Sequence, residues 1–328
     1  MGDMSRREFG WLATELGVLG VSGALTAGCS SSTQPSAAPS APPTRATIPA
    51  LPESPTPRPI KLTQADVDRI IGNHANTLLD HLRARVPRLN YGVAVAFAYP
   101  NRQFNRFYMY GTVAEKAPPN ERTIFGIASI TKTFTAALFA NGVSMQPDCF
   151  DWDAGLARYL GRYLGNGSGL SPTMQRLTPR MLAQHTSGLP RQATGPRDGI
   201  GLFREEPSRV PADVVKLWRI HDNPQPGSCW LYSNLGFFTL GFAAVSAYDT
   251  AGGGTTDLSY KGLLGDQITG PLNMPDTVTI VPDGAAVARA HPNGGNVSAG
   301  DAPDIKSSAS DMHTWLLAHL GALSGPPT

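Results

Sequence analysis

One segment of the chain has apolar residues that recur every three or four positions. They are Val67, Ile70, Ile71, Leu78, Leu79 and Leu82. This spacing places them on one side of a helix. Thr63 and Asp66 stand just ahead of them in an arrangement typical of a capping box. Residues 62–86 are therefore predicted to form an amphipathic helix.

Two segments rich in β-branched and aromatic residues follow this helix. They are "YGVAVAFA" at residues 91–98 and "QFNRFYMYGTVA" at residues 103–114, and the turn-like "YPNR" separates them. Such residues favour strands, and a short turn between two strands favours a hairpin. The sequence therefore predicts a helix and a β-hairpin at the start of the fold.

The pattern becomes helical after the hairpin. The run "FGIASITKTFTAALFA" at residues 125–140 is helix-like, and short helices between Gly- and Pro-rich loops are expected from about Leu138 to Ala247. The clearest of these later helices are residues 177–184 and 233–248. Strands followed mainly by helices indicate an α+β fold.

The first thirty residues resemble an export signal. Arg6 and Arg7 form a twin-arginine pair, a weakly apolar run follows, and "LTAGC" resembles the lipid-attachment box of bacterial lipoproteins. Residues 1–29 are predicted to be a twin-arginine lipoprotein signal peptide, with the lipid attached to Cys29. The protein would then be exported and anchored to the outer face of the bacterial cytoplasmic membrane. The alternative is an amphipathic N-terminal helix with a chance cysteine.

Residues 30–59 consist mainly of Pro, Ser, Ala and Thr. Such a segment buries too little apolar surface to offset its ordering entropy, so it is predicted to be an extended linker. The folded domain is expected to span residues 60–328. It contains Cys149 and Cys229, and whether these pair is left open because their separation cannot be known from sequence.

The charge balance excludes one class of partner. The chain has 27 Lys and Arg against 25 Asp and Glu, so no nucleic-acid partner is expected. Neither a metal nor another cofactor is expected, because His291, His313 and His319 are scattered and form no ligand pattern. His185 is interpreted as a structural turn residue.

Ser129 and Lys132 are the first candidates for chemistry. A serine hydroxyl needs a nearby base to become a good nucleophile. Positions three apart on a helix are neighbours, so the lysine amine can approach the serine oxygen. A Ser-x-x-Lys quartet alone is weak support, because it arises by chance about once in a chain of this length.

Five segments in order make the pattern specific. They are "FGIASITKTFTAALFA", "LTPRMLAQHTSGLP", "PGSCWLYSNLGFFTLG", "ITGPLNMPDT" and "IKSSASDMHTWLLAHL". With these, the chain resembles the superfamily of serine β-lactamases, penicillin-binding D,D-peptidases and related esterases, in particular its class C branch. The resemblance spans roughly residues 62–320. It implies an antiparallel sheet flanked by helices, with an all-helical subdomain.

The resemblance also implies site residues. Ser129 matches the acylated nucleophile and Lys132 its partner lysine. In "YSN", Tyr232 matches the phenol that shuttles the proton, and Asn234 matches the amide that positions the substrate. Gln192 follows "SGLP" where the family often has a glutamine near the substrate amide. The implied substrates are β-lactams, D-Ala-D-Ala peptides or small esters.

One family motif is not found where it is expected. A Lys-Thr-Gly or His/Trp-x-Gly triplet on a sheet strand should follow "SSASDM" by several tens of residues, but the sequence ends at Thr328. "HPNGG" at His291 precedes that motif and is out of order. The domain is therefore predicted to be C-terminally truncated, without its last strands. The N-terminal hairpin would then have an unpaired edge and an uncovered apolar face, which predicts low stability.

Two functions follow from these features. The first is a serine hydrolase that forms an acyl-enzyme on Ser129. The alternative is a catalytically crippled envelope lipoprotein that binds peptidoglycan-like ligands without turnover. A purely structural lipoprotein would require all five motifs to be accidental.

Overall fold

The computed structural model describes residues 63–85, 87, 90–98, 106–113, 117–164, 169–191, 212–221, 226–253, 258–281, 285 and 305–321. The predicted signal peptide with Cys29, the predicted linker and Gln192 lie outside the described residues. The chain divides into two units, Met1–Thr63 and Gln64–Thr328, and the helices and strands described below belong to the second.

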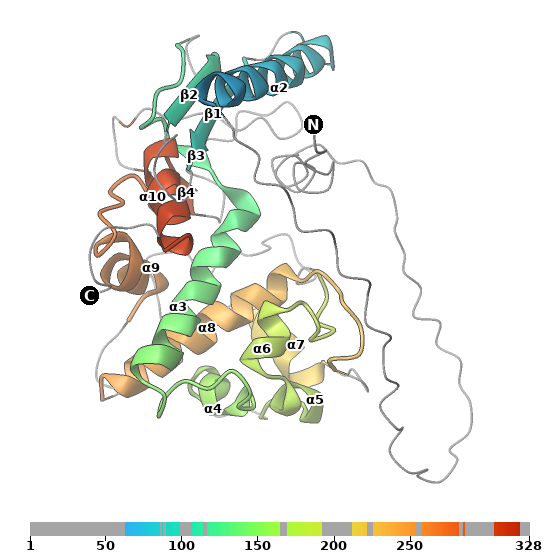
Figure 1. The fold of residues 1–328 in the computed structure, drawn as a ribbon. Coiled ribbons are helices and arrows are strands. Elements are labelled where there is room, and N and C mark those ends of the chain that lie inside the picture. Colours follow the sequence, from blue (N-terminus) through green and yellow to red (C-terminus); the bar gives the residue numbers. More distant parts are fainter. Residues whose placement is uncertain are drawn as a thin grey trace, which may run out of the picture. The chain divides into compact units, whose positions relative to one another are not determined.

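The described elements follow one another as a helix, a hairpin and then mainly helices (Figure 1). They are α2 (Gln64–Arg85), β1 (Gly92–Phe97), β2 (Arg106–Gly111), β3 (Phe125–Gly126), the 3-10 turn η2 (Ala128–Ile130), α3 (Thr131–Met145), α4 (Ala157–Leu160), the 3-10 turn η3 (Gly161–Tyr163), α5 (Pro172–Arg176), α6 (Pro179–Ala183), α7 (Ala212–Ile220), α8 (Asn234–Ala251), α9 (Tyr260–Leu264), the π-helical turn η4 (Gly265–Thr269), β4 (Lys306–Ser307) and α10 (Ala309–His319).

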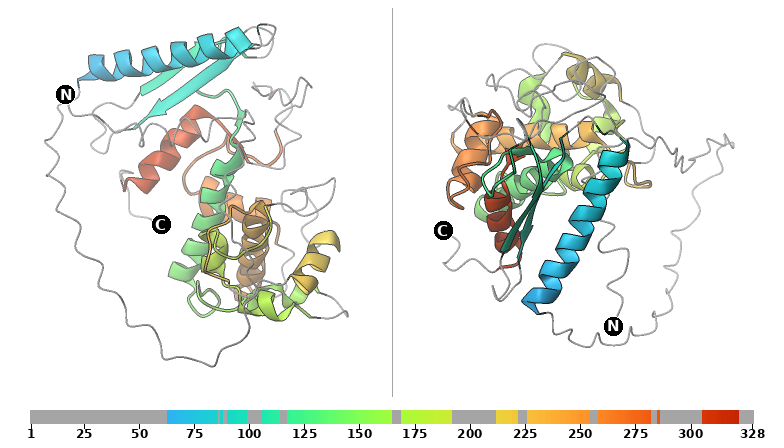
Figure 2. Two further views of the ribbon diagram at one scale, coloured as in Figure 1. Left: turned by 90° about the vertical axis from the view of Figure 1, so that its right-hand side faces the viewer. Right: turned by 90° about the horizontal axis from the view of Figure 1, so that it is seen from above.

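Strands β1 and β2 form the predicted antiparallel hairpin, with Val95 opposite Tyr108. The buried side of α2 consists of Val67, Ile71, Ala75 and Leu79, which are spaced four apart. Helix α2 contacts both strands and α10 contacts β1, so the hairpin lies between the two helices (Figure 2). Helix α10 thus covers part of the hairpin that was predicted to be exposed, but no residue of β1 or β2 is fully buried, and in the described part the sheet has only these two strands.

Helices α3 and α8 pack against each other and form the centre of the domain (Figure 1). Every residue of α8 from Leu235 to Asp249 is buried. A helix that is apolar on all sides must be surrounded by other elements. Phe134, Leu138 and Phe139 of α3 are fully buried in the same core.

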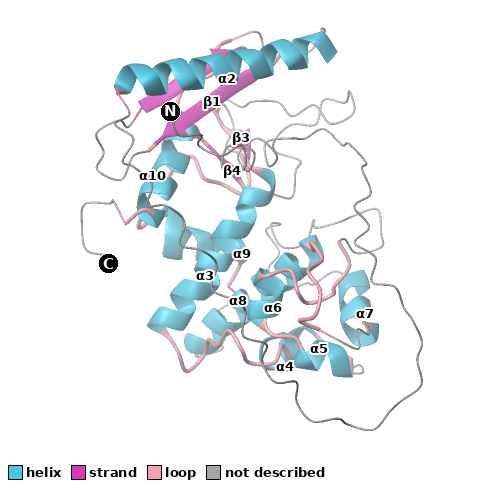
Figure 3. Ribbon diagram, turned by 45° about the vertical axis from the view of Figure 1, so that its right-hand side comes forward, coloured by secondary structure: helices cyan, strands magenta, loops and turns pink. Residues whose placement is uncertain are grey.

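Short helices pack against α8. Helices α4 and α6 contact α8, and α4 contacts α5. Ser171 begins α5 and Thr178 begins α6; each side-chain oxygen accepts a backbone N–H of the first turn, and each is followed by proline. This part agrees with the predicted all-helical subdomain, and helices dominate over the small antiparallel sheets (Figure 3).

A second small sheet joins distant parts of the chain. In it, β3 pairs antiparallel with β4, so that Phe125 lies opposite Ser307 and Gly126 opposite Lys306. The Ser308 side chain caps α10 by accepting the Asp311 N–H. This brings the fifth sequence motif beside the first.

The described residues also show whether the two cysteines of the domain pair and whether a helix could cross a membrane. No disulfide joins Cys149 to Cys229, because Cys149 packs against the core after α3 whereas Cys229 is exposed in the loop before α8. Among the described helices, none is long and apolar enough to cross a membrane.

Gly142 in α3 provides a test of the α3 packing. A methyl group at this position would overlap the ring of Phe150, which is 1% exposed and packs against Phe139 and Tyr248. Alanine gains about 1 kcal/mol of helix propensity over glycine, whereas overpacking costs about 1–3 kcal/mol. We expect Gly142→Ala to lower the melting temperature, measured by circular dichroism.

Gly161→Ala is the matched control. Gly161 has helical backbone angles and open space around the added methyl group. We expect its melting temperature to equal or exceed that of the wild type. A Gly142→Ala protein as stable as the wild type would contradict the tight α3 packing.

Candidate active site

Ser129 lies in the turn that leads into α3. The sequence placed it within a helix, but the structure places it in the 3-10 turn η2, directly before α3. The preceding residue, Ala128, has a φ of +44°, which is uncommon for a residue with a side chain. The backbone therefore bends sharply immediately before the serine.

The segment before β4 holds this turn from one side. The Ile127 N–H donates to the Ile305 carbonyl at 3.1 Å, and the Ile305 N–H donates to the Thr131 hydroxyl at 3.1 Å. Residues 127 and 131 flank Ser129, so both ends of its turn are bonded to one residue. The β3–β4 pairing extends this connection.

Lys306 anchors the same segment. Its side chain is almost fully buried at 1% exposure, and its ammonium group donates to the Thr279 carbonyl at 2.9 Å. A buried ammonium group requires such partners. Val278 and Lys306 also exchange backbone hydrogen bonds of 2.8 Å. The loop after η4 thereby supports β4, which supports the turn of Ser129.

Lys132 lies in the first turn of α3, and its Nζ donates to the Ser129 Oγ at 3.1 Å. The same nitrogen is 5.0 Å from the ring centroid of Tyr232 and 5.8 Å from that of Phe237. Aromatic faces attract a cation at such distances. The lysine is thus held between the serine and the start of α8.

Tyr232 approaches Ser129 from the other side. A hydrogen bond joins its hydroxyl to the Ser129 Oγ, although 103 positions separate the two residues. The guanidinium of Arg191 lies 5.5 Å from the centroid of the Tyr232 ring. The structure thus brings Ser129, Lys132 and Tyr232 into one hydrogen-bonded group.

The loop that carries Tyr232 is bonded to residues 185–191. Gly227 donates to the Thr186 carbonyl at 2.8 Å, and Asn234 donates to the Arg191 carbonyl at 2.8 Å. Ser233 is buried, donates its hydroxyl to the Pro190 carbonyl and caps α8 by accepting the Gly236 N–H. The second and third sequence motifs therefore form one support for the tyrosine.

The two predicted substrate-binding residues, Asn234 and Gln192, are not part of this hydrogen-bonded group in the described structure. Asn234 is the first residue of α8, and within the described part no hydrogen bond joins its side chain to Ser129 or Lys132. Gln192 lies outside the described residues. Arg191 and Trp230 also lie at the site, although no sequence motif predicts them. Trp230 is 67% exposed, and its ring centroid is 6.4 Å from that of Tyr232.

This geometry can activate a nucleophile. Two groups that exchange protons meet the serine oxygen, as nucleophilic catalysis by serine requires. Both α3 and α8 begin at this point, and the N-terminus of a helix stabilises negative charge nearby. The site can therefore support attack on a carbonyl group and the negative charge that results.

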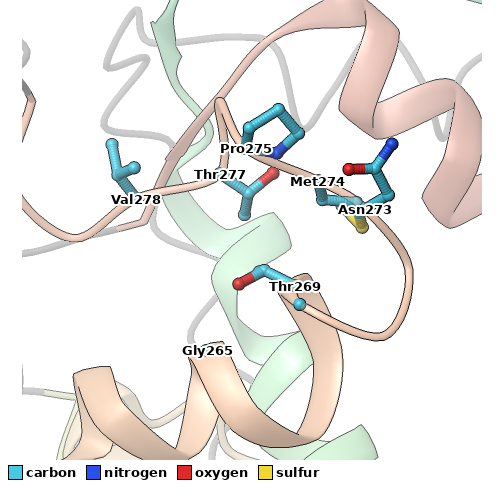
Figure 4. Close-up of a pocket in the computed structure, with 8 residues that line it drawn as sticks. Gly265, Thr269, Asn273, Met274, Pro275, Thr277 and Val278 are labelled. Atoms are coloured by element: carbon cyan, nitrogen blue, oxygen red, sulfur yellow. The ribbon is translucent and has the colours of Figure 1, made fainter.

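A hollow of about 330 Å³ lies along the turn after η4, and Ser129, Lys132 and Tyr232 are not among the residues that line it (Figure 4). None of the residues that line it is ionisable; they are Gly265, Thr269, Gly270, Asn273, Met274, Pro275, Thr277 and Val278. It offers no nucleophile or base. Of the residues with described positions, no group of three or more His, Cys, Asp or Glu is arranged to hold a metal ion.

The β-lactamase family model matches residues 82–327, well over half of the chain. A β-lactamase of Escherichia coli (strain K12) is 24% identical over 251 residues, covering 71% of this chain and 57% of that protein. A β-lactamase of Yersinia enterocolitica is 25% identical over 280 residues, covering 81% and 63%. The chain thus spans about three fifths of the length of these relatives.

Solved structures show the same fold. A class C β-lactamase in complex with cefoxitin has a TM-score of 0.57 at 21% identity, covering 79% of this chain and 68% of that chain. A second class C β-lactamase gives a TM-score of 0.56 at 21% identity. The chain therefore belongs to the β-lactamase family and has the fold of the serine β-lactamase and transpeptidase superfamily.

Proposed function

We propose that the protein is a serine hydrolase that forms an acyl-enzyme on Ser129. The observation that carries this proposal is the convergence of the Lys132 amine and the Tyr232 hydroxyl on the Ser129 oxygen. Membership of the β-lactamase family supports it. The substrate class is a β-lactam, a D-Ala-D-Ala peptide or a small ester.

In the proposed reaction, the Ser129 oxygen attacks the substrate carbonyl carbon and gives its proton to the Lys132–Tyr232 pair. Negative charge then develops on the carbonyl oxygen, and the helix N-terminus at Ser129 stabilises it. Collapse of this intermediate breaks the bond to the leaving nitrogen or oxygen, and Tyr232 returns the proton to that atom. Water later attacks the ester on Ser129, which releases the acid and restores the serine.

The alternative is that the chain binds or is acylated without turnover. It spans 57% and 63% of the two curated relatives, so the complete activity of those proteins cannot be transferred to it directly.

We also propose that the protein is exported and anchored by a lipid on Cys29. The twin-arginine pair and the "LTAGC" sequence support this location. The Pro-rich segment after Cys29 would then separate the anchor from the hydrolase domain.

Substrate turnover tests the proposed activity. The full chain should be assayed with a chromogenic cephalosporin, a D-Ala-D-Ala peptide and a p-nitrophenyl ester. We expect hydrolysis of at least one, and its loss in Ser129→Ala because the nucleophile is removed. Hydrolysis that persists in Ser129→Ala would contradict the assignment of the serine. Acylation without product release would favour the crippled alternative.

Tyr232→Phe tests the proton shuttle. This change removes only the hydroxyl bonded to Ser129 and keeps the ring contacts. We expect acylation of Ser129 to slow by about a hundredfold or more, the usual contribution of a positioned acid or base, with an unchanged melting temperature. Tyr163→Phe is the control, because that hydroxyl contacts the Phe242 carbonyl instead. Equal acylation rates in the two variants would argue against a proton shuttle at Tyr232.

Cys29→Ser tests the location. In a bacterial host, we expect the wild-type protein to incorporate radiolabelled palmitate and to sediment with membranes. The variant should lose the label, because serine lacks the thiol to which the lipid attaches. Label that persists in Cys29→Ser would rule out this attachment site.

A further inference from the structure

His185 accepts hydrogen bonds from the backbone on both sides of Tyr232. Its carbonyl accepts the Leu231 N–H at 2.7 Å, and its imidazole Nδ1 accepts the Ser233 N–H at 3.0 Å. One residue thus bonds to the two neighbours of the tyrosine. Its φ of +58° lies in the left-handed region, which turns the chain so that both groups face this loop.

The imidazole ring also packs against the phenol itself. Its centroid is 4.5 Å from that of Tyr232, with an angle of 34° between the ring planes. Phe237 of α8 lies 5.0 Å away and Trp230 lies 5.8 Å away. The histidine therefore fixes both the backbone and the ring of Tyr232.

We propose that His185 is a positioning residue for Tyr232, and that it holds the phenol at Ser129 only while its imidazole is neutral. This inference rests on the proposed hydrolase function. Because Nδ1 accepts the Ser233 N–H, the single imidazole proton is on Nε2. Protonation would place an N–H on Nδ1, directly facing the Ser233 N–H, and the hydrogen bond would be lost.

The charges around His185 act in the same direction. Lys132 faces it from α3, Tyr232 is the titratable group of the loop whose ring contacts it, and Arg191 lies against the Tyr232 ring from the segment of His185 itself. The contact from α8, Phe237, does not titrate. Among these groups no carboxylate is present to stabilise an imidazolium, so a proton on His185 adds a second cation beside Lys132.

Burial and, secondarily, the charge of Lys132 lower the pKa of His185 below its usual 6.5. The unfolded chain therefore binds this proton more readily than the folded protein. The stability that neutral His185 contributes is complete above about pH 6.5 and declines as the pH falls through the lower folded-state pKa. Activity that depends on this geometry is expected to decline over the same acidic range.

The pH dependence of acylation distinguishes positioning from a merely structural role. The rate at which a fluorophosphonate probe labels Ser129 in the full chain should be measured from about pH 5 to 8, a range that brackets the usual imidazole pKa. We expect the wild-type rate to fall on the acidic side. In His185→Asn, the amide oxygen can accept the Ser233 N–H, and asparagine tolerates a positive φ. This variant lacks the ring contact with Tyr232, so its rate at neutral pH is expected to fall modestly, but it should lose the acidic decline assigned to His185.

Two further variants complete the comparison. His185→Phe keeps a ring but has no acceptor, so labelling should slow by about tenfold to a hundredfold at all pH values, as expected for a misplaced catalytic group. His74→Asn on α2 is the control, because His74 is exposed and bonds within its own helix. Its profile should match the wild type. An unchanged acidic decline in His185→Asn would overturn the proposal.

A second readout does not depend on reactivity. The imidazole of His185 and the backbone amide of Ser233 can be followed by NMR as the pH is lowered. We expect both signals to change with one shared midpoint below pH 6.5, because one proton breaks the bond between them. If Ser129 is not labelled at any pH, the proposed hydrolase function fails while this titration still tests the bond. A Ser233 amide that does not respond to His185 would refute the positioning role.

Discussion

The packing of α3 against α8 is the contact on which the site depends. Ser129 precedes the first helix and Tyr232 precedes the second, so the two residues meet only where the starts of these helices meet. Helix α8 is buried on all sides, which leaves it little freedom to shift or rotate. The hydrophobic core thus fixes a polar group of three side chains at its edge.

Two further sets of hydrogen bonds hold the Ser129 turn and the Tyr232 loop in place. Ile305 is bonded to both ends of the Ser129 turn, and β4 pairs with β3 just before it. On the other side, residues 185–191 hold the loop of Tyr232 through backbone bonds and through His185. Catalytic groups require such support because small displacements lower rates steeply. Segments that are far apart in the sequence therefore hold Ser129 and Tyr232 in contact.

Much of this could be predicted from local patterns. The apolar spacing predicted α2, the β-branched residues predicted the hairpin, and the ordered motifs indicated the family and brought Ser129, Lys132 and Tyr232 to attention. Local patterns could not predict the pairing of β3 with β4, because each strand has two residues and about 180 positions separate them. They also could not predict that Ala128 has a positive φ, or that His185 contacts Tyr232, since both depend on tertiary packing. Gln192 and Cys29 remain predictions outside the described residues.

The central claim is that the folded chain activates the Ser129 oxygen. The most direct measurement is mass spectrometry of the full chain after incubation with a penicillin, followed by digestion to locate the modification. We expect the added mass of one ring-opened penicillin on the peptide that contains Ser129. An adduct on another residue, or one that forms equally in Ser129→Ala, would contradict it.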